Sequence, residues 1–161
     1  MKNLLSKHGF TAGLTLLISH LFLPLPAFAE QLTVENAYVR ATIPGTSVSS
    51  AYMEIVNHSD KPLVLLAASS PVTDRIEIHQ HTMEDGMMKM RKQASLTIPA
   101  HQTVMLQPGG YHLMIFNLAT GLKAGEQIPL KLTFEGGESL QVTLPVQSIV
   151  REKSQQSHHH H

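Results

Sequence analysis

The 161-residue chain contains no cysteine and no tryptophan, and only 5% of its residues are aromatic. Without a thiolate it cannot form a disulfide, a Cys-ligated zinc site, an iron–sulfur cluster or a blue-copper centre. An excess of one charge is also lacking, because 12 Lys and Arg balance 12 Asp and Glu. This balance provides no basic surface for nucleic acid. What the chain has in excess is His, with 11 residues, and Met, with 8.

Residues 1–29 have the pattern of a secretory signal peptide. Lys2 and Lys7 precede an apolar run over residues 10–25, and Ala27-Phe28-Ala29 is a small-x-small cleavage site. The run is short for a membrane span, which needs about 20 apolar residues. We therefore expect cleavage before Glu30, export to the periplasm and no stable membrane insertion afterwards. An uncleaved N-terminal anchor is the less favoured alternative.

Residues 30–150 have the length of one domain, and their hydrophobic pattern predicts strands. Apolar and polar residues alternate in short runs, separated by turn sequences such as Glu84-Asp85-Gly86 and Pro108-Gly109-Gly110. No window alternates convincingly with the period of a helix. The pattern predicts an all-β fold, a β-sandwich or Greek-key barrel of short, mostly antiparallel strands. The expected strands are Gln31–Ile43, Ala51–Asn57, Leu63–Ser69, Arg75–His81, Met87–Lys92, Thr103–Gln107, Tyr111–Asn117, Ile128–Glu135 and Ser139–Val146.

Residues 151–161 form a polar tail that ends in four histidines, His158, His159, His160 and His161. The composition fits an expression tag and a native metal-collecting tail equally well. In either case the clustered imidazoles are expected to bind Cu(II) in addition to any site in the domain.

A fifteen-residue segment, 77–91, contains two His and four Met. Because side chains alternate along a strand, His79 and His81 lie on the face opposite to Ile76 and Ile78. The turn at 84–86 is expected to fold the segment into a hairpin. The hairpin would bring this His face toward the face that carries Met88 and Met90.

A further strand, 111–116, places His112 and Met114 on one side and Leu113 and Ile115 on the other. Residues i and i+2 of a strand are about 6.5–7 Å apart, so an imidazole and a thioether there can reach one ion. Met is more often a core filler than a ligand, and a single His or Met would be assigned to packing. Two strands that each carry both residue types on a face outside the core favour a metal site. Met53 and Met105 are assigned to the core.

The donor types select the metal. Imidazole and thioether together suit Cu(I), whereas zinc prefers thiolate or carboxylate with imidazole, and calcium and magnesium require oxygen. The residues therefore favour a copper site in an exported, thiol-free protein.

The spacing of these residues also resembles the signature of the periplasmic copper chaperone family PCu(A)C. The signature is His79, ten residues, Met90, twenty-one residues, His112, one residue and Met114. Residues 78–91 and 108–114 are similar to the two characteristic blocks of that family. The resemblance covers most of residues 30–145, including Ala37-Tyr38-Val39-Arg40 and Ala51-Tyr52-Met53.

The resemblance implies a cupredoxin-like β-sandwich that is not an enzyme. It implies one Cu(I) held by His79, Met90, His112 and Met114. The usual recipient in the family is the CuA centre of cytochrome c oxidase, so the implied partner is oxidase subunit II or another copper chaperone. Some members carry Met directly after the first His, where this chain has Gln80. The motif assigns no role to His81 or Met83.

Three other functions remain open from the sequence. A copper storage or resistance protein would have the same site and no dedicated recipient. A copper redox enzyme such as a dismutase is less favoured, because thioether ligands favour Cu(I) over easy redox cycling. A binding or adhesion module would carry its His and Met incidentally.

Overall fold

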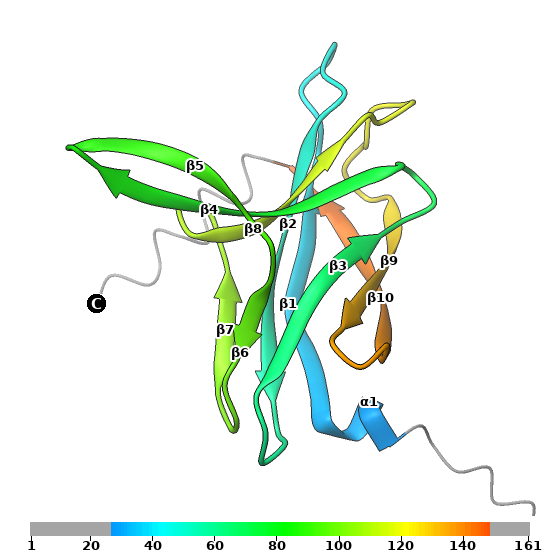
Figure 1. The fold of residues 1–161 in the computed structure, drawn as a ribbon. Helices are drawn as coiled ribbons and strands as arrows, with labels where there is room; N and C mark the ends of the chain where they lie inside the picture. Colours follow the sequence, from blue (N-terminus) through cyan, green and yellow to red (C-terminus); the bar gives the residue numbers. More distant parts are fainter. Residues whose placement is uncertain (1–26, 149–161) are drawn as a thin grey trace, which may run out of the picture.

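The computed structural model describes residues 27–148, which form ten strands and one short helix (Figure 1). The helix α1 spans Ala27–Gln31. The strands are β1 (Leu32–Arg40), β2 (Ser49–Asn57), β3 (Leu63–Ser69), β4 (Arg75–Glu84), β5 (Met87–Gln93), β6 (Leu96–Ile98), β7 (Thr103–Leu106), β8 (Tyr111–Phe116), β9 (Gln127–Phe134) and β10 (Ser139–Gln147).

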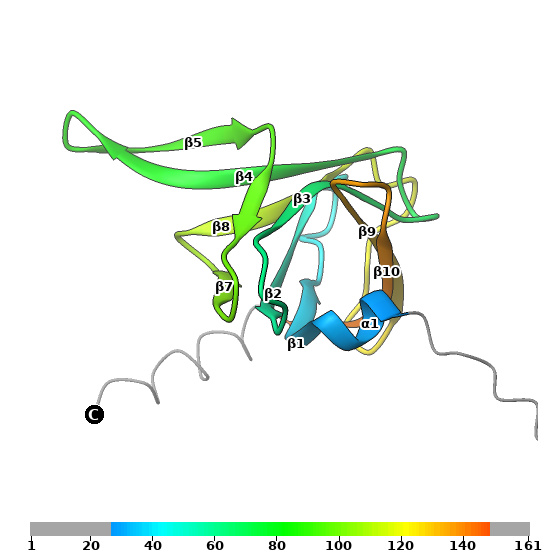
Figure 2. The same ribbon diagram turned by 60° about the horizontal axis from the view of Figure 1, so that its bottom comes forward.

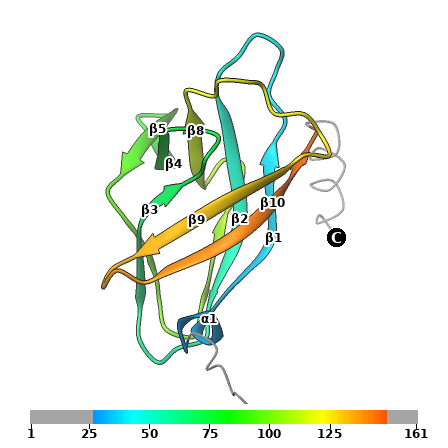
Figure 3. The ribbon, with the colours of Figure 1, turned by 90° about the vertical axis from the view of Figure 1, so that its right-hand side faces the viewer.

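The strands pair in the order β5-β4-β8-β7-β2-β1-β10-β9-β3-β6, with β8 also pairing with β2. Only β1–β10 and β7–β8 are parallel among the described pairings. The β9–β10 hairpin crosses in front of β1 and β2 and forms a second layer (Figure 3). The all-β class and the mostly antiparallel pairing expected from the alternation are confirmed.

The core lies between the inward faces of these strands. Alternate residues of β9 and β10 belong to the same core cluster as residues of β2, β4 and β8, as the two-residue period of strands requires. The largest fully buried side chains include Phe134, Leu132, Met53, Leu113 and Ile115. This core holds the inner face of the strands that carry the His and Met residues, and leaves their outer face for other contacts.

The β4–β5 hairpin extends away from the body of the protein (Figures 1 and 2). Strand β4 pairs with β8 only from Arg75 to Gln80, and its remaining residues pair with β5 alone. The hairpin closes through Asp85 and Gly86, whose φ angles are 52° and 73°. Two consecutive positive φ angles match the tight turn that Asp-Gly favours. The hairpin predicted around residues 84–86 is therefore confirmed.

Several details differ from the sequence-based expectations. The strand expected over Gln31–Ile43 ends at Arg40, and the strand expected over Arg75–His81 continues to Glu84. The three-residue strand β6 was not expected, because it is too short to show an alternation. The assignment of Met105 to the core is wrong: this side chain is 50% exposed, whereas Met53 is 1% exposed as expected. Pairing of Glu54 with Met105 puts both on the outer face of the sheet.

The described residues contain no helix long and apolar enough to cross a membrane. The expected signal peptide falls outside the described residues except for 27–29, which belong to α1. The ring of Phe28 in this helix lies 5.3 Å from that of Phe134. The His-rich tail, 151–161, also lies outside the described residues.

Candidate metal centre

The expected ligands from β4 and β8 lie side by side on the outer face of the sheet. Strand register pairs His79 with His112 and Glu77 with Met114. Paired residues of antiparallel strands point to the same face, so His79, His112 and Met114 share one face. Leu113 and Ile115, the intervening residues of β8, are fully buried in the core. The sequence-based assignment of faces on this strand is thus confirmed.

Met90 lies on the same face but one row further out along the hairpin. It pairs with His81, whereas the partner of His79 on β5 is Lys92. Met90 is also 44% exposed. The hairpin therefore brings Met90 directly opposite His81 and diagonally toward His79.

His112 is the most buried of the polar groups on this face, with 2% of its surface exposed. Its Nδ1–H donates to the backbone carbonyl of Gly110 at 3.2 Å, which assigns the lone pair of the ring to Nε2. Burial lowers the pKa of His112, and the neighbouring His81 and His79 lower it further. A neutral imidazole with one fixed donor atom is the form that binds metal.

His79 is oriented by Glu77, two residues before it on the same face. The ring Nε2–H donates to Glu77 Oε2 at 2.8 Å, and Nδ1 is buried without a hydrogen-bond partner among the described residues. Hydrogen bonds from His79, Lys92 and Arg75 lower the pKa of Glu77 to about 2. A carboxylate that holds one nitrogen of a histidine is the usual support of a metal-binding imidazole.

His81 lies between Met90 and His112. Its ring stacks on that of His112 with centroids 5.0 Å apart, and its Nδ1 is also buried without a described hydrogen-bond partner. The His79 and His112 centroids are 5.9 Å apart. Even so, within residues 27–148 no three His, Cys, Asp or Glu side chains converge to hold one metal ion. A metal on this face therefore needs thioether donors beside the imidazoles.

Met114 provides a thioether close to the histidine pair. It is half-buried, and Ser50 of β2 donates a hydrogen bond to its sulfur at 3.6 Å. Thioether and imidazole are neutral ligands, so a univalent ion bound here keeps its positive charge. The nearby charges include those of Glu77, of its partners Lys92 and Arg75, and of Arg40, which acts on His112. The arrangement is suited to a soft univalent cation.

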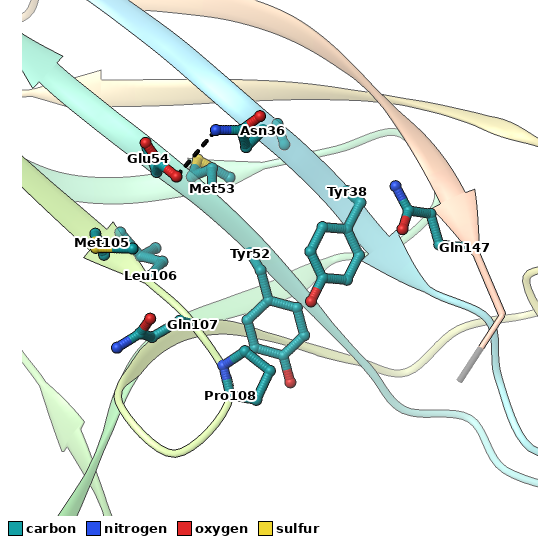
Figure 4. Close-up of a pocket in the computed structure, with 11 residues that line it drawn as sticks. Asn36, Tyr38, Tyr52, Met53, Glu54, Met105, Leu106, Gln107, Pro108 and Gln147 are labelled. Carbon is teal, nitrogen blue, oxygen red and sulfur yellow. Dashed lines mark hydrogen bonds between the residues drawn. The ribbon is translucent and has the colours of Figure 1, made fainter. Parts of the chain in front are cut away.

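A hollow of about 610 Å³ lies beside this face, between β1, β2 and β7 (Figure 4). Tyr52 forms part of its wall and lies with its ring centroid 6.3 Å from that of His112. Its charged lining residue, Glu54, accepts a hydrogen bond from Asn36 at 2.9 Å. The hollow is thus a neighbour of the His and Met residues, separated from them by Tyr52.

Comparison of sequences identifies a family. The family model described as "Putative lipoprotein LpqE-like" matches residues 32–146. The Leifsonia xyli subsp. xyli protein Lxx21020, named as a lipoprotein, is 29% identical over 122 residues, which are 75% of this chain and 72% of that protein. The Rickettsia prowazekii protein RP573 is 30% identical over 90 residues, which are 55% of this chain and 50% of that protein.

Comparison of structures finds the same architecture in copper proteins. The Cu(I) form of DR1885 from Deinococcus radiodurans is 34% identical, with 77% of this chain and 85% of that chain aligned at a TM-score of 0.61. The apo form of DR1885 is 31% identical, with 93% of this chain and 98% of that chain aligned at a TM-score of 0.60. The copper-bound PCuAC domain of PmoF2 has a TM-score of 0.63 over 73% of this chain and 93% of the domain, at 20% identity. This last likeness concerns the fold alone and confirms the cupredoxin-like class.

Proposed function

The chain belongs to the LpqE-like family, and on this premise we propose that it is an exported Cu(I) chaperone of the periplasm. It binds one copper ion as cargo and passes it to a recipient protein. The proposed ligands are two imidazoles and two thioethers, His79, His112, Met90 and Met114. The chain catalyses no reaction in this proposal.

The observation that carries the proposal is the pair His79–His112 on adjacent strands. Glu77 holds Nε2 of His79 and the Gly110 carbonyl holds Nδ1 of His112, so each ring keeps a defined donor nitrogen. Such preorganisation lowers the cost of binding an ion, because the rings need not be reoriented. Met114 and Met90 on the same face supply the soft donors that favour Cu(I) over Cu(II). Support also comes from DR1885, a relative at 34% identity that has a Cu(I)-bound form.

The proposed copper site lies at the surface, which suits a protein that must release its cargo. Met90 is 44% exposed at the outer side of the site, whereas His112 is 2% exposed at the inner side. A recipient can therefore replace Met90 first, while the histidines still hold the ion. The resemblance to PCu(A)C proteins points to the CuA centre of cytochrome c oxidase subunit II as the recipient, with another copper chaperone as the alternative.

The ligand set is tested by anaerobic Cu(I) titration against a competing chelator. Met90→Leu is expected to weaken Cu(I) binding by at least about tenfold and to affect Cu(II) less, because the thioether serves the softer ion. Met105→Leu is the matched control, since Met105 is similarly exposed, at 50%, but lies on β7. His112→Ala should weaken both oxidation states. Equal affinities for wild type, Met90→Leu and Met105→Leu would exclude Met90 as a ligand.

The recipient is tested separately. The Cu(I)-loaded protein is mixed with the metal-free soluble domain of oxidase subunit II, the two are separated, and the copper content of each is measured. Transfer to subunit II is the expected result. Retention of copper by this protein, with an intact Cu(I) site, would instead favour storage or resistance.

A further inference from the structure

Two large apolar side chains are exposed together on one face of the tip of the β4–β5 hairpin. Met83 and Met88 are paired across the strands, and 67% and 62% of their respective surfaces are exposed. The two-residue turn makes Glu84–Met87 the hydrogen-bonded closing pair, so Met83–Met88 is a non-hydrogen-bonded pair. In such pairs the Cα atoms are only about 4.5 Å apart and the side chains are closest. The two sulfur atoms are thus carried by neighbouring positions on one face.

Packing does not account for these methionines. Beyond Gln80, strand β4 pairs only with β5, and the tip extends from the body of the protein (Figure 2). Polar contacts on the opposite face stabilise the hairpin instead. Arg91 binds Glu84 at 2.6 Å, and Lys89 lies 3.3 Å from the same carboxylate. Exposed thioethers in such a polar hairpin are therefore better explained as soft metal donors than as packing residues.

A third donor lies next to this pair. His81 precedes Met83 by two residues on the same strand face, a spacing of about 6.5–7 Å that lets both side chains reach one ion. Its Nδ1 is buried and has no hydrogen-bond partner among the described residues. His81 also does not join His79 and His112 in a three-imidazole group within the described residues. Its available partners are therefore thioethers.

We propose that Met83, Met88 and His81 form an outer Cu(I) site through which cargo enters and leaves the inner site of His79, His112, Met114 and Met90. This proposal rests on the proposed function, since the inner site is its destination. Met90 lies directly opposite His81, between the two sites, and serves both. Copper remains Cu(I) throughout and moves by exchange of one neutral ligand for another. The transfer therefore needs no electron donor or acceptor.

The test uses anaerobic Cu(I) and protein labelled with ¹³C at the methionine methyl groups. The first equivalent of Cu(I) is expected to shift the methyl signals of Met90 and Met114, and the second those of Met83 and Met88. The variant Met83→Leu/Met88→Leu keeps the apolar volume. It should lose the second equivalent, keep the affinity for the first, and release Cu(I) to a chelator more slowly than wild type.

The matched control is Met87→Leu/Met105→Leu. These residues are 61% and 50% exposed but lie outside the proposed outer site, so stoichiometry and release rate should equal those of wild type. The outer site would be overturned if the Met83 and Met88 signals did not shift with the second equivalent of Cu(I). It would also be overturned if Met83→Leu/Met88→Leu released Cu(I) at the wild-type rate. Failure of the inner site has a different signature: the signal of Met114, which belongs to the inner site alone, would not respond to copper at all.

Discussion

Glu77 provides the sharpest test of how the protein prepares its metal site. Its carboxylate accepts hydrogen bonds from His79 at 2.8 Å, from Arg75 at 2.9 Å and from Lys92 at 3.0 Å. Glu77→Gln keeps the shape of the side chain but removes the charge. The neutral amide holds the His79 ring less firmly, and it leaves two uncompensated cations near the bound copper. We therefore expect weaker Cu(I) binding without loss of the fold.

The magnitude follows from the behaviour of groups that support metal ligands. Removing such a partner costs about 10–100-fold in metal affinity, which corresponds to about 1.4–2.8 kcal/mol of binding free energy. Glu84→Gln is the matched control. Glu84 lies on the same strand, is paired with Arg91 and Lys89, and also has its pKa lowered to about 2. It holds no histidine, so Glu84→Gln should leave the Cu(I) affinity unchanged.

The assay is anaerobic competition for Cu(I) with a chelator, applied to wild type and both variants. Long-range ¹H–¹⁵N spectra of the metal-free protein provide a second measurement, which a purely structural role would not alter. In wild type the proton of His79 should be on Nε2, whereas Glu77→Gln should populate both tautomers. Equal affinities for the two variants would refute the positioning role of Glu77, and so would an unchanged tautomer of His79.

Two further predictions concern the stability of the metal-free protein. Contact with Arg91 lowers the pKa of Glu84 from 4.5 to about 2, so its contribution is present above pH 4.5 and is lost as the pH falls toward 2. Thermal unfolding followed across this range should show a smaller loss in Glu84→Gln than in wild type, and parallel curves would contradict the ion pair. Leu132 is fully buried in β9. The substitution Leu132→Ala should lower the free energy of unfolding by about 2–5 kcal/mol. Urea unfolding measures this change, and a loss well below that range would show that the core around β9 collapses into the cavity.

Local patterns in the sequence were sufficient to predict most of the architecture. Alternation marks strands directly, and Asp85-Gly86 specifies the turn that joins β4 to β5. The same two-residue period correctly placed Leu113 and Ile115 in the core and His112 on the opposite face. Met105 was misplaced because an apolar residue among apolar neighbours carries no sign of its face. The pairing with Glu54 decides it, and that pairing is long-range.

In the metal centre, too, local patterns were predictable from the sequence, whereas the pairing between strands was not. Residue types pointed to the His and Met strands, the resemblance to the PCu(A)C signature implied the set His79, Met90, His112 and Met114, and the register puts all four on one face. Spacing along the chain cannot show that Met90 pairs with His81, because the register of a hairpin depends on its turn. Once the turn is known to have two residues, counting outward from Glu84–Met87 places the pairs Met83–Met88 and His81–Met90.

The hairpin turn therefore determines more than the end of a strand. One additional residue in the turn would shift β5 against β4 and move its side chains to the opposite face. Met88 and Met90 would then leave the face of the histidines, and Met87, Lys89 and Arg91 would replace them. The distribution of residue types agrees with the observed register. Lys89 and Arg91 of β5 lie on the side of Glu84, and Met88 and Met90 lie on the side of His81. The turn thus decides whether the thioethers of Met88 and Met90 or the charged groups of Lys89 and Arg91 face the histidines. In this way the folding of the hairpin determines which donors are offered to the proposed copper ion.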